Sequence, residues 1–128
     1  MAITPVSELV AQAKARITTL PPDQARAMAD AGDALLIDIR DVRELQREGR
    51  VPGAIHAPRG MLEFWVDPES PYHKPAFATD KTLILFCAGA MRSALAAATL
   101  QDMGVTNVAE MDEGFGGWKD RGLPVEQD

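Results

Sequence analysis

The sequence is poor in cysteine and histidine. Among its 128 residues there is one cysteine, Cys87, and there are two histidines. A single cysteine excludes an internal disulfide, and so few thiol and imidazole groups argue against a zinc cluster. We therefore predict no metal and no other cofactor. The first five residues lack the basic-then-apolar order of a secretory signal, so a reducing compartment, the cytoplasm, is expected.

The sequence also lacks a long apolar run and an excess of positive charge. No run approaches the roughly 20 apolar residues of a membrane-spanning helix, so no membrane partner is predicted. The formal net charge of −6 argues against nucleic acid, which selects basic surfaces. The length fits one domain over residues 1–128. Within it we expect an N-terminal helical extension, 1–20, and a core, 21–125.

Short apolar runs alternate with segments of helical pattern. Strands are expected at Ala34–Ile39, around Ile55, at Thr82–Phe86 and within 107–111. Helices are expected over Ser7–Ile17 with Ser7 as its cap, and over 23–31, 41–49, 92–103 and 115–122. Segment 59–79 contains three prolines and is predicted as one helical turn and a long loop. The alternation is typical of an α/β fold, a mostly parallel sheet covered on both faces.

Two further details of packing follow from the helical pattern. Gly32 and Gly104 stand where a glycine ends a helix. For the helix over 92–103, the pattern predicts an inward face made of Leu95, Thr99, Leu100 and Met103.

Cys87 directly follows the expected strand Thr82–Phe86 and precedes a helix that begins at Arg92. In parallel sheets, ligands bind beyond the carboxyl ends of the strands. Small residues at 88–90 leave backbone N–H groups accessible, and a helix N-terminus adds partial positive charge, so this loop can form an anion site. A thiol there is expected to be partly ionised at neutral pH. The alternative is a buried cysteine that only packs.

Two chemistries place a cysteine in such an anion site. Cysteine-dependent phosphatases and arsenate reductases separate the cysteine from an arginine by five residues, which makes room for a tetrahedral oxyanion. Here only the four residues 88–91 separate Cys87 from Arg92, and Ser93 stands where a phosphatase would have its arginine. The shorter loop favours a persulfide or a small sulfur anion and disfavours a phosphatase.

Four segments, in this order, resemble the rhodanese-like (sulfurtransferase) family over about residues 20–125. LLIDIRDVREL has Asp38 and Arg40 at the family's Asp-x-Arg positions, and GRVPGAIHAP is similar to the segment that follows. CAGAMRSALAA resembles the active-site loop Cys-x-x-Gly-x-Arg-Ser. MDEGFGGWKDRGLPV is similar in part to the closing motif Gly-Gly-x-x-x-Trp-x-x-x-Gly-x-Pro-Val. The resemblance implies a three-layer α/β/α fold with a roughly five-stranded sheet.

The resemblance also implies a ping-pong sulfur transfer. Cys87 would take a sulfane sulfur from thiosulfate or a persulfide donor, hold it as a persulfide, and pass it to a thiol or cyanide. Asp38 and Arg40 would brace the loop. The partners implied are a small sulfur-donor anion or persulfide and a thiol acceptor, and a homodimer is left open. The terminal sulfur's charge would be stabilised by the loop Ala88, Gly89, Ala90, Met91, Arg92 and Ser93.

The sequence departs from the family pattern at three places. Ala90 stands where many members have glycine, and Phe115 is taken as the replacement of the closing motif's second glycine. Ala88 and Gly89 are uncharged where thiosulfate-preferring enzymes often carry basic residues, which favours a persulfide donor. The displaced glycine leaves open an alternative, a catalytically quiet module that binds a partner or regulates.

Four residues outside the loop are candidates for a pocket rim: Arg59, Phe64, Trp65 and His73. Each also has a simpler interpretation, which we favour. Arg59 would form a surface salt bridge, Phe64 and Trp65 would anchor the long loop, and His73 would be a solvated loop residue.

Overall fold

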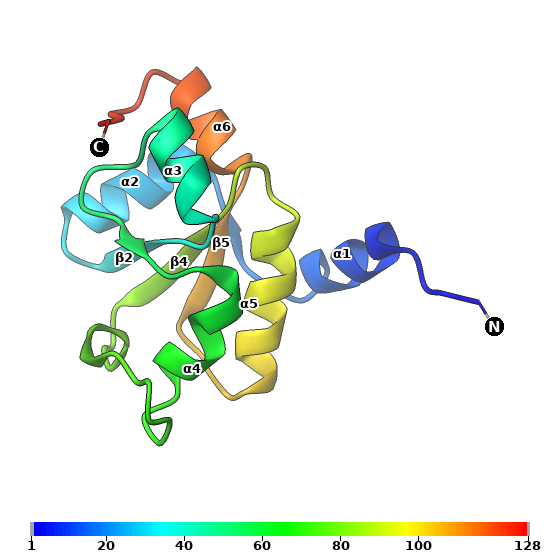
Figure 1. Cartoon of the computed structure of the whole chain (residues 1–128). Helices are drawn as coiled ribbons and strands as arrows, with labels where there is room; N and C mark the ends of the chain where they lie inside the picture. Colours follow the sequence, from blue (N-terminus) through cyan, green and yellow to red (C-terminus); the bar gives the residue numbers. More distant parts are fainter. Residues whose placement is uncertain (1, 128) are drawn as a thin grey trace.

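The computed structural model describes residues 2–127 and contains a five-stranded parallel sheet (Figure 1). Its strands are β1 (Thr19–Leu20), β2 (Ala34–Asp38), β3 (Ile55–His56), β4 (Thr82–Phe86) and β5 (Val108–Met111), in the order β1-β5-β4-β2-β3. The expected parallel sheet of about five strands is confirmed. The sequence pattern missed β1, because two residues are too short to show a period of two.

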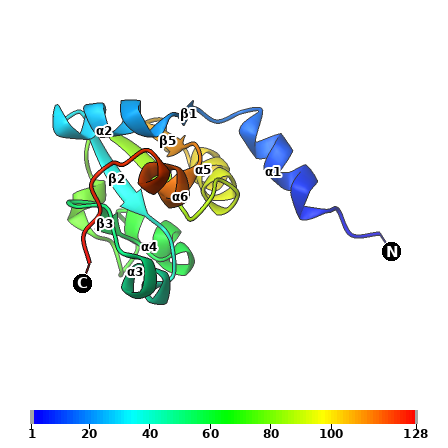
Figure 2. The same cartoon turned by 90° about the horizontal axis from the view of Figure 1, so that it is seen from above.

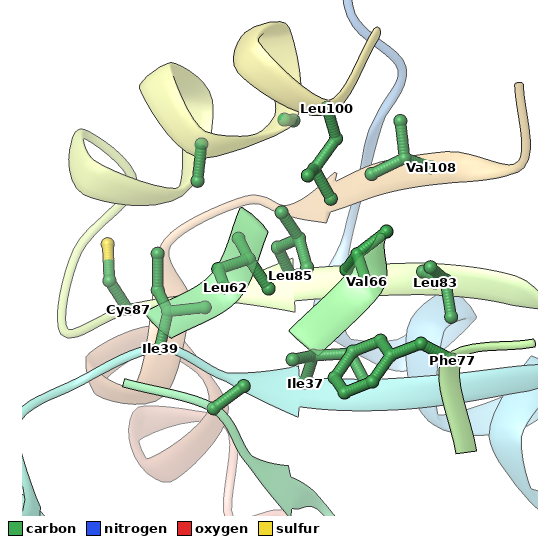
Figure 3. Packing of buried hydrophobic residues seen from close by; sticks show 13 residues of the cluster. Ile37, Ile39, Leu62, Val66, Phe77, Leu83, Leu85, Cys87, Leu100 and Val108 are labelled. Carbon is green, nitrogen blue, oxygen red and sulfur yellow. The ribbon is translucent and has the colours of Figure 1, made fainter. Parts of the chain in front are cut away.

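Helices cover both faces of the sheet, which confirms the three-layer prediction (Figure 2). On one face, α2 (Pro22–Asp30) and α6 (Gly114–Asp120) pack through Ala25, Phe115 and Trp118. On the other face lie α4 (Leu62–Val66) and α5 (Arg92–Asp102). Since side chains alternate along a strand, Leu85 and Cys87 share this second face (Figure 3).

Segment 59–79 forms more helix than expected. A 3₁₀ turn, η1 (Arg59–Met61), leads into α4, and a second one, η2 (Pro75–Phe77), precedes β4. Phe77 packs against Leu83, the second residue of β4, so the part of the segment that follows α4 runs along the amino end of the sheet (Figure 3). This end is opposite the edge where Cys87 lies.

The N-terminal helix α1 (Val6–Lys14) is present as predicted, but it begins and ends earlier. Ser7 is not its cap: Pro5 occupies the cap position with extended backbone and no side-chain cap hydrogen bond forms. Val10 and Ala13 pack against Ala94 of α5, whereas residues 2–5, which precede the helix, extend away from the body of the domain (Figures 1 and 2). Within residues 2–127, no helix combines the length and apolar character needed to cross a membrane.

The predicted inward face of α5 needs correction. Leu100 is buried, but Leu95 and Thr99 are only partly buried and Met103 is 44% exposed. The buried residues are otherwise small: Ser93, Ala94, Ala96 and Ala97. The helix lies between α1 and the sheet, and contact on two sides at close range selects small side chains. Gly32 and Gly104 end α2 and α5 with positive φ, as predicted.

Candidate active site

Cys87 lies directly beyond the carboxyl end of the central strand β4 and is 1% exposed. Its sulfur points toward the side of the sheet on which α5 lies (Figure 3). Cys87 is one of the residues that line a pocket of about 360 Å³; the others are Val6, Gly89, Ala90, Met91, Arg92 and Leu95. The N-terminal extension therefore supplies one wall of the pocket.

The loop after Cys87 keeps its N–H groups free. Within residues 2–127, none of the N–H groups of residues 88–92 donates a hydrogen bond. The residues are small or, like Met91, turn the side chain outward, so the donors are not covered by bulky neighbours. Such a run of unpaired N–H groups before a helix can hold a negatively charged atom.

The carbonyl side of the loop is held by α6. The N–H groups of Phe115 and Gly116 donate to the carbonyl oxygens of Cys87 and Ala88, at 2.7 and 3.0 Å. Gly114 has φ +58, and a Cβ atom there would lie 2.8 Å from the carbonyl carbon of Ala88 and closer still to two carbonyl oxygens. Only glycine permits this approach.

Two expectations about glycine replacements need revision. Phe115 lies inside α6 with its ring buried, so it does not occupy a position that requires glycine. The non-glycine residue with positive φ in the described chain is Glu113, at φ 62, next to Gly114. Ala90 is not in this region, and the loop therefore takes a path that alanine adopts without strain.

Arg92 is already engaged by a carboxylate. Its guanidinium donates to both oxygens of Glu44 in α3 (Val42–Glu48), at 2.8 and 3.0 Å. These hydrogen bonds, together with the nearby Cys87 sulfur, raise the pKa of Arg92, and they lower the pKa of Glu44. The cation beside the loop is thus fixed in place, and its charge is largely neutralised.

Asp38 and Arg40 form a buried ion pair at the carboxyl end of β2. Arg40 Nη2 donates to Asp38 Oδ2 at 2.7 Å and to the Gly49 carbonyl at 2.9 Å. The Arg40 guanidinium lies 4.0 Å from the centroid of the Phe115 ring. The pair thereby connects β2, the end of α3 and the helix that holds the Cys87 loop.

Ser93 and Glu110 extend the site into the sheet. Ser93 Oγ lies 3.6 Å from Cys87 Sγ and donates to Glu110 Oε1 at 2.7 Å. Glu110, in β5, is 0% exposed, and its other oxygen accepts from Lys14 and Thr19. Glu110 is not among the candidates drawn from the sequence, although an acidic residue inside the apolar run of an inner strand is a pattern that could have identified it.

The four rim candidates are not among the residues that line the Cys87 pocket. Arg59 forms an ion pair of 2.7 Å with Glu63, as the simpler interpretation predicted. His73 contacts the Trp65 carbonyl at 2.9 Å and lines a separate pocket near Leu83.

The aromatic residues among these candidates pack within the long loop. Trp65 lies under the Lys74 ammonium, and Phe64 meets Tyr72 edge to face at 6.3 Å. Phe64 is nevertheless 50% exposed. These contacts belong to α4 and to the segment that follows it, and they agree with the anchoring interpretation.

The fold and the loop define a class: a parallel α/β protein with a cysteine between the central strand and a loop whose N–H groups are free of hydrogen bonds in the described chain. Within that class, the chain belongs to the rhodanese-like domain family, whose model matches residues 21–121. The resemblance expected from the four sequence segments is confirmed.

Individual relatives agree with the family. The chain is 33% identical over 100 residues to the thiosulfate sulfurtransferase GlpE of Stutzerimonas stutzeri, covering 78% of this chain and 83% of that protein. The polysulfide-sulfur transferase homodimer of Wolinella succinogenes superposes with a TM-score of 0.71 at 31% identity, covering 94% of this chain and 86% of that one.

A Rhodopseudomonas palustris protein of unknown function, described as a possible tyrosine phosphatase, has a TM-score of 0.92 at 46% identity. The match covers 98% of this chain and 97% of that chain.

Proposed function

We propose that the protein is a sulfurtransferase that carries a sulfane sulfur as a persulfide on Cys87 and delivers it to a thiol acceptor, with cyanide as an alternative acceptor. The observation that carries the proposal is the loop itself. Cys87 lines a pocket, and the N–H groups of residues 88–92 are without hydrogen-bond partners in the described chain. A terminal persulfide sulfur needs donors of this kind.

The reaction has two displacements at sulfur. In the first, the Cys87 thiolate attacks the outer sulfur of the donor; the new S–S bond forms, the donor's bond breaks, and the donor leaves as an anion with the electron pair. In the second, the acceptor thiolate attacks the outer sulfur of the persulfide, and the Cys87 thiolate is the leaving group. The loop N–H groups hold the charge on the outer sulfur between the two steps.

A persulfide donor suits the pocket better than the thiosulfate dianion. Ala88 and Gly89 carry no charge, and Arg92 is paired with Glu44. The remaining walls, Val6 and Leu95 among them, are apolar. A dianion would enter with little charge compensation, whereas an organic persulfide brings an apolar group to an apolar wall.

A phosphatase is the less favoured candidate, although a similar solved structure carries that description. Only four residues separate Cys87 from Arg92, and the Arg92 guanidinium is turned to Glu44. The alternative of a catalytically quiet binding module also loses support. It was suggested by Ala90, which stands where many family members have glycine, but Ala90 does not have a positive φ and is therefore unstrained. A cytoplasmic location stays a prediction, and a homodimer is still left open.

The proposal is tested by intact-mass spectrometry after incubation with glutathione persulfide or thiosulfate. We expect one added sulfur atom on the wild-type chain, more completely with the persulfide, and its removal by a reductant. If neither donor adds a sulfur atom to a folded wild-type protein, the proposed function is wrong.

A further inference from the structure

A series of hydrogen-bonded side chains, centred on the buried Glu110, links the N-terminal helix to Cys87. Lys14, the last residue of α1, donates to Glu110 Oε2 at 2.8 Å, and Thr19 donates to the same oxygen at 3.0 Å. Ser93 donates to Glu110 Oε1 at 2.7 Å and lies 3.6 Å from the sulfur. A fully buried carboxylate is costly unless it is paired and hydrogen-bonded, and here all its donors are supplied.

The direction of these hydrogen bonds is fixed by chemistry. A carboxylate only accepts, so Ser93 must give its single hydroxyl hydrogen to Glu110. Ser93 Oγ then presents lone pairs to Cys87 Sγ. In that orientation Ser93 accepts from a thiol but cannot donate to a thiolate.

We propose that Glu110 is a positioning residue that acts through Ser93: it fixes the hydroxyl as an acceptor and disfavours negative charge on Cys87 Sγ. The consequence for sulfur transfer rests on the proposed function. In the persulfide, the charge moves to the outer sulfur, away from Glu110 and among the loop N–H groups. Glu110 therefore favours the sulfur-loaded protein over the free thiolate.

Other charges near the sulfur do not reverse this effect. Arg92 is the cation on the loop side, and it is paired with Glu44. Lys14 is the cation on the sheet side, and Glu110 lies between it and Ser93. The described part of the chain places Glu110 as the carboxylate that reaches the sulfur through one intervening hydroxyl.

Glu110→Gln tests the inference, because Lys14 dictates how the amide must lie. An ammonium only donates, so the carbonyl oxygen of the glutamine faces Lys14 and its NH₂ group faces Ser93. Ser93 then accepts from the amide and turns its own hydrogen to the sulfur. We expect iodoacetamide to alkylate Cys87 about three- to tenfold faster than in the wild type near pH 6.5, with an unchanged plateau rate at high pH.

Two further variants give the sign and the route. Ser93→Ala removes the acceptor of the thiol hydrogen, so alkylation near pH 6.5 should be faster than in the wild type. In a Ser93→Ala background, Glu110→Gln should change the alkylation rate by less than half of the factor that it gives in the wild type, because the hydroxyl that transmits the effect is gone. Glu63→Gln, which breaks the distant Arg59–Glu63 pair, is the matched control and should leave the profile unchanged.

Alkylation needs no sulfur donor, so this experiment is independent of sulfur transfer. If the wild-type protein fails to load sulfur but Glu110→Gln is alkylated faster, the proposed function is wrong and the positioning role of Glu110 still holds. Slower or equal alkylation of folded Glu110→Gln overturns the positioning role, and a slower rate would indicate that Glu110 instead receives the thiol's proton. An equal effect in the Ser93→Ala background overturns the route through Ser93.

Circular dichroism checks that each variant folds. Should Glu110→Gln not fold, Ser93→Ala decides, because it removes one hydroxyl group and adds no volume to the core. Alkylation of that variant at or below the wild-type rate would then contradict the proposal.

Discussion

Gly114 packs against Gly89 so closely that the backbone of α6 and the backbone of the Cys87 loop are in direct contact. The helix N-terminus donates two hydrogen bonds to loop carbonyls at the same place. The shape of the loop, and with it the direction of its free N–H groups, is therefore determined by Gly114, which follows Cys87 by 27 positions and is not among the residues that line the pocket.

Gly114→Ala should displace the loop. The substitution places a side chain in the left-handed region, at a cost of about 1–2 kcal/mol, and drives a methyl group into the loop carbonyls. We expect a lower free energy of unfolding in urea and a loss of most sulfur loading. Gly122→Ala is the matched control, because Gly122 has φ +73 with open space around it. If the two variants load sulfur equally well, the contact is not what shapes the loop.

The buried Asp38–Arg40 pair should be essential for stability. Asp38→Asn leaves the Arg40 guanidinium buried without its counter-charge, which typically costs about 3–5 kcal/mol. Breaking the half-buried Arg59–Glu63 pair by Glu63→Gln should cost less than about 1 kcal/mol. Urea denaturation of both variants gives the comparison. A loss for Asp38→Asn as small as that for Glu63→Gln would contradict the bracing role.

The Arg92–Glu44 pair should show in the pH dependence of stability. Arg92 lowers the pKa of Glu44 in the folded protein, so the pair stabilises fully above the ordinary glutamate pKa of 4.5, and the contribution is lost as the pH falls through the lowered value. The difference in unfolding free energy between wild type and Glu44→Gln should be present at neutral pH and vanish in acid. A difference that grows on acidification would contradict the assignment.

The same pair should control donor choice. Glu44→Gln frees the Arg92 guanidinium, and Ala88→Lys adds a charge to the loop; each should improve kcat/KM for thiosulfate by about tenfold and leave a persulfide donor nearly unaffected. Side-by-side kinetics with both donors makes the comparison. If the wild type already prefers thiosulfate and neither variant changes the ratio, the argument from loop charge is wrong.

The sequence predicted the parts of the site that are local in the chain. An apolar strand that ends at Phe86, a cysteine and small residues before Arg92 are visible without a structure. The partner of Arg92 was not visible, because Glu44 reaches it from a helix 48 positions earlier. Nor could periodicity show that Glu113, rather than Phe115, takes the left-handed conformation, since φ depends on how closely α6 approaches the loop.

The rim candidates show the same limit. His73 and Trp65 stand in a long loop, and nothing in the residues says to which end of the sheet that loop runs. Packing of Phe77 against Leu83 holds the part after α4 at the amino end, away from Cys87. Glu110 was missed for a related reason: its partners Lys14, Thr19 and Ser93 come from three other elements.

The central claim is that Cys87 carries sulfur as a discrete covalent intermediate, and the second half-reaction tests it most directly. Wild-type protein is loaded with glutathione persulfide, freed of donor, and then mixed with a thiol while its intact mass is followed. We predict that the added sulfur atom leaves the protein as the thiol is converted to its persulfide, and that a folded Cys87→Ser variant neither gains nor releases sulfur. Transfer by Cys87→Ser at a rate near that of the wild type would contradict the account.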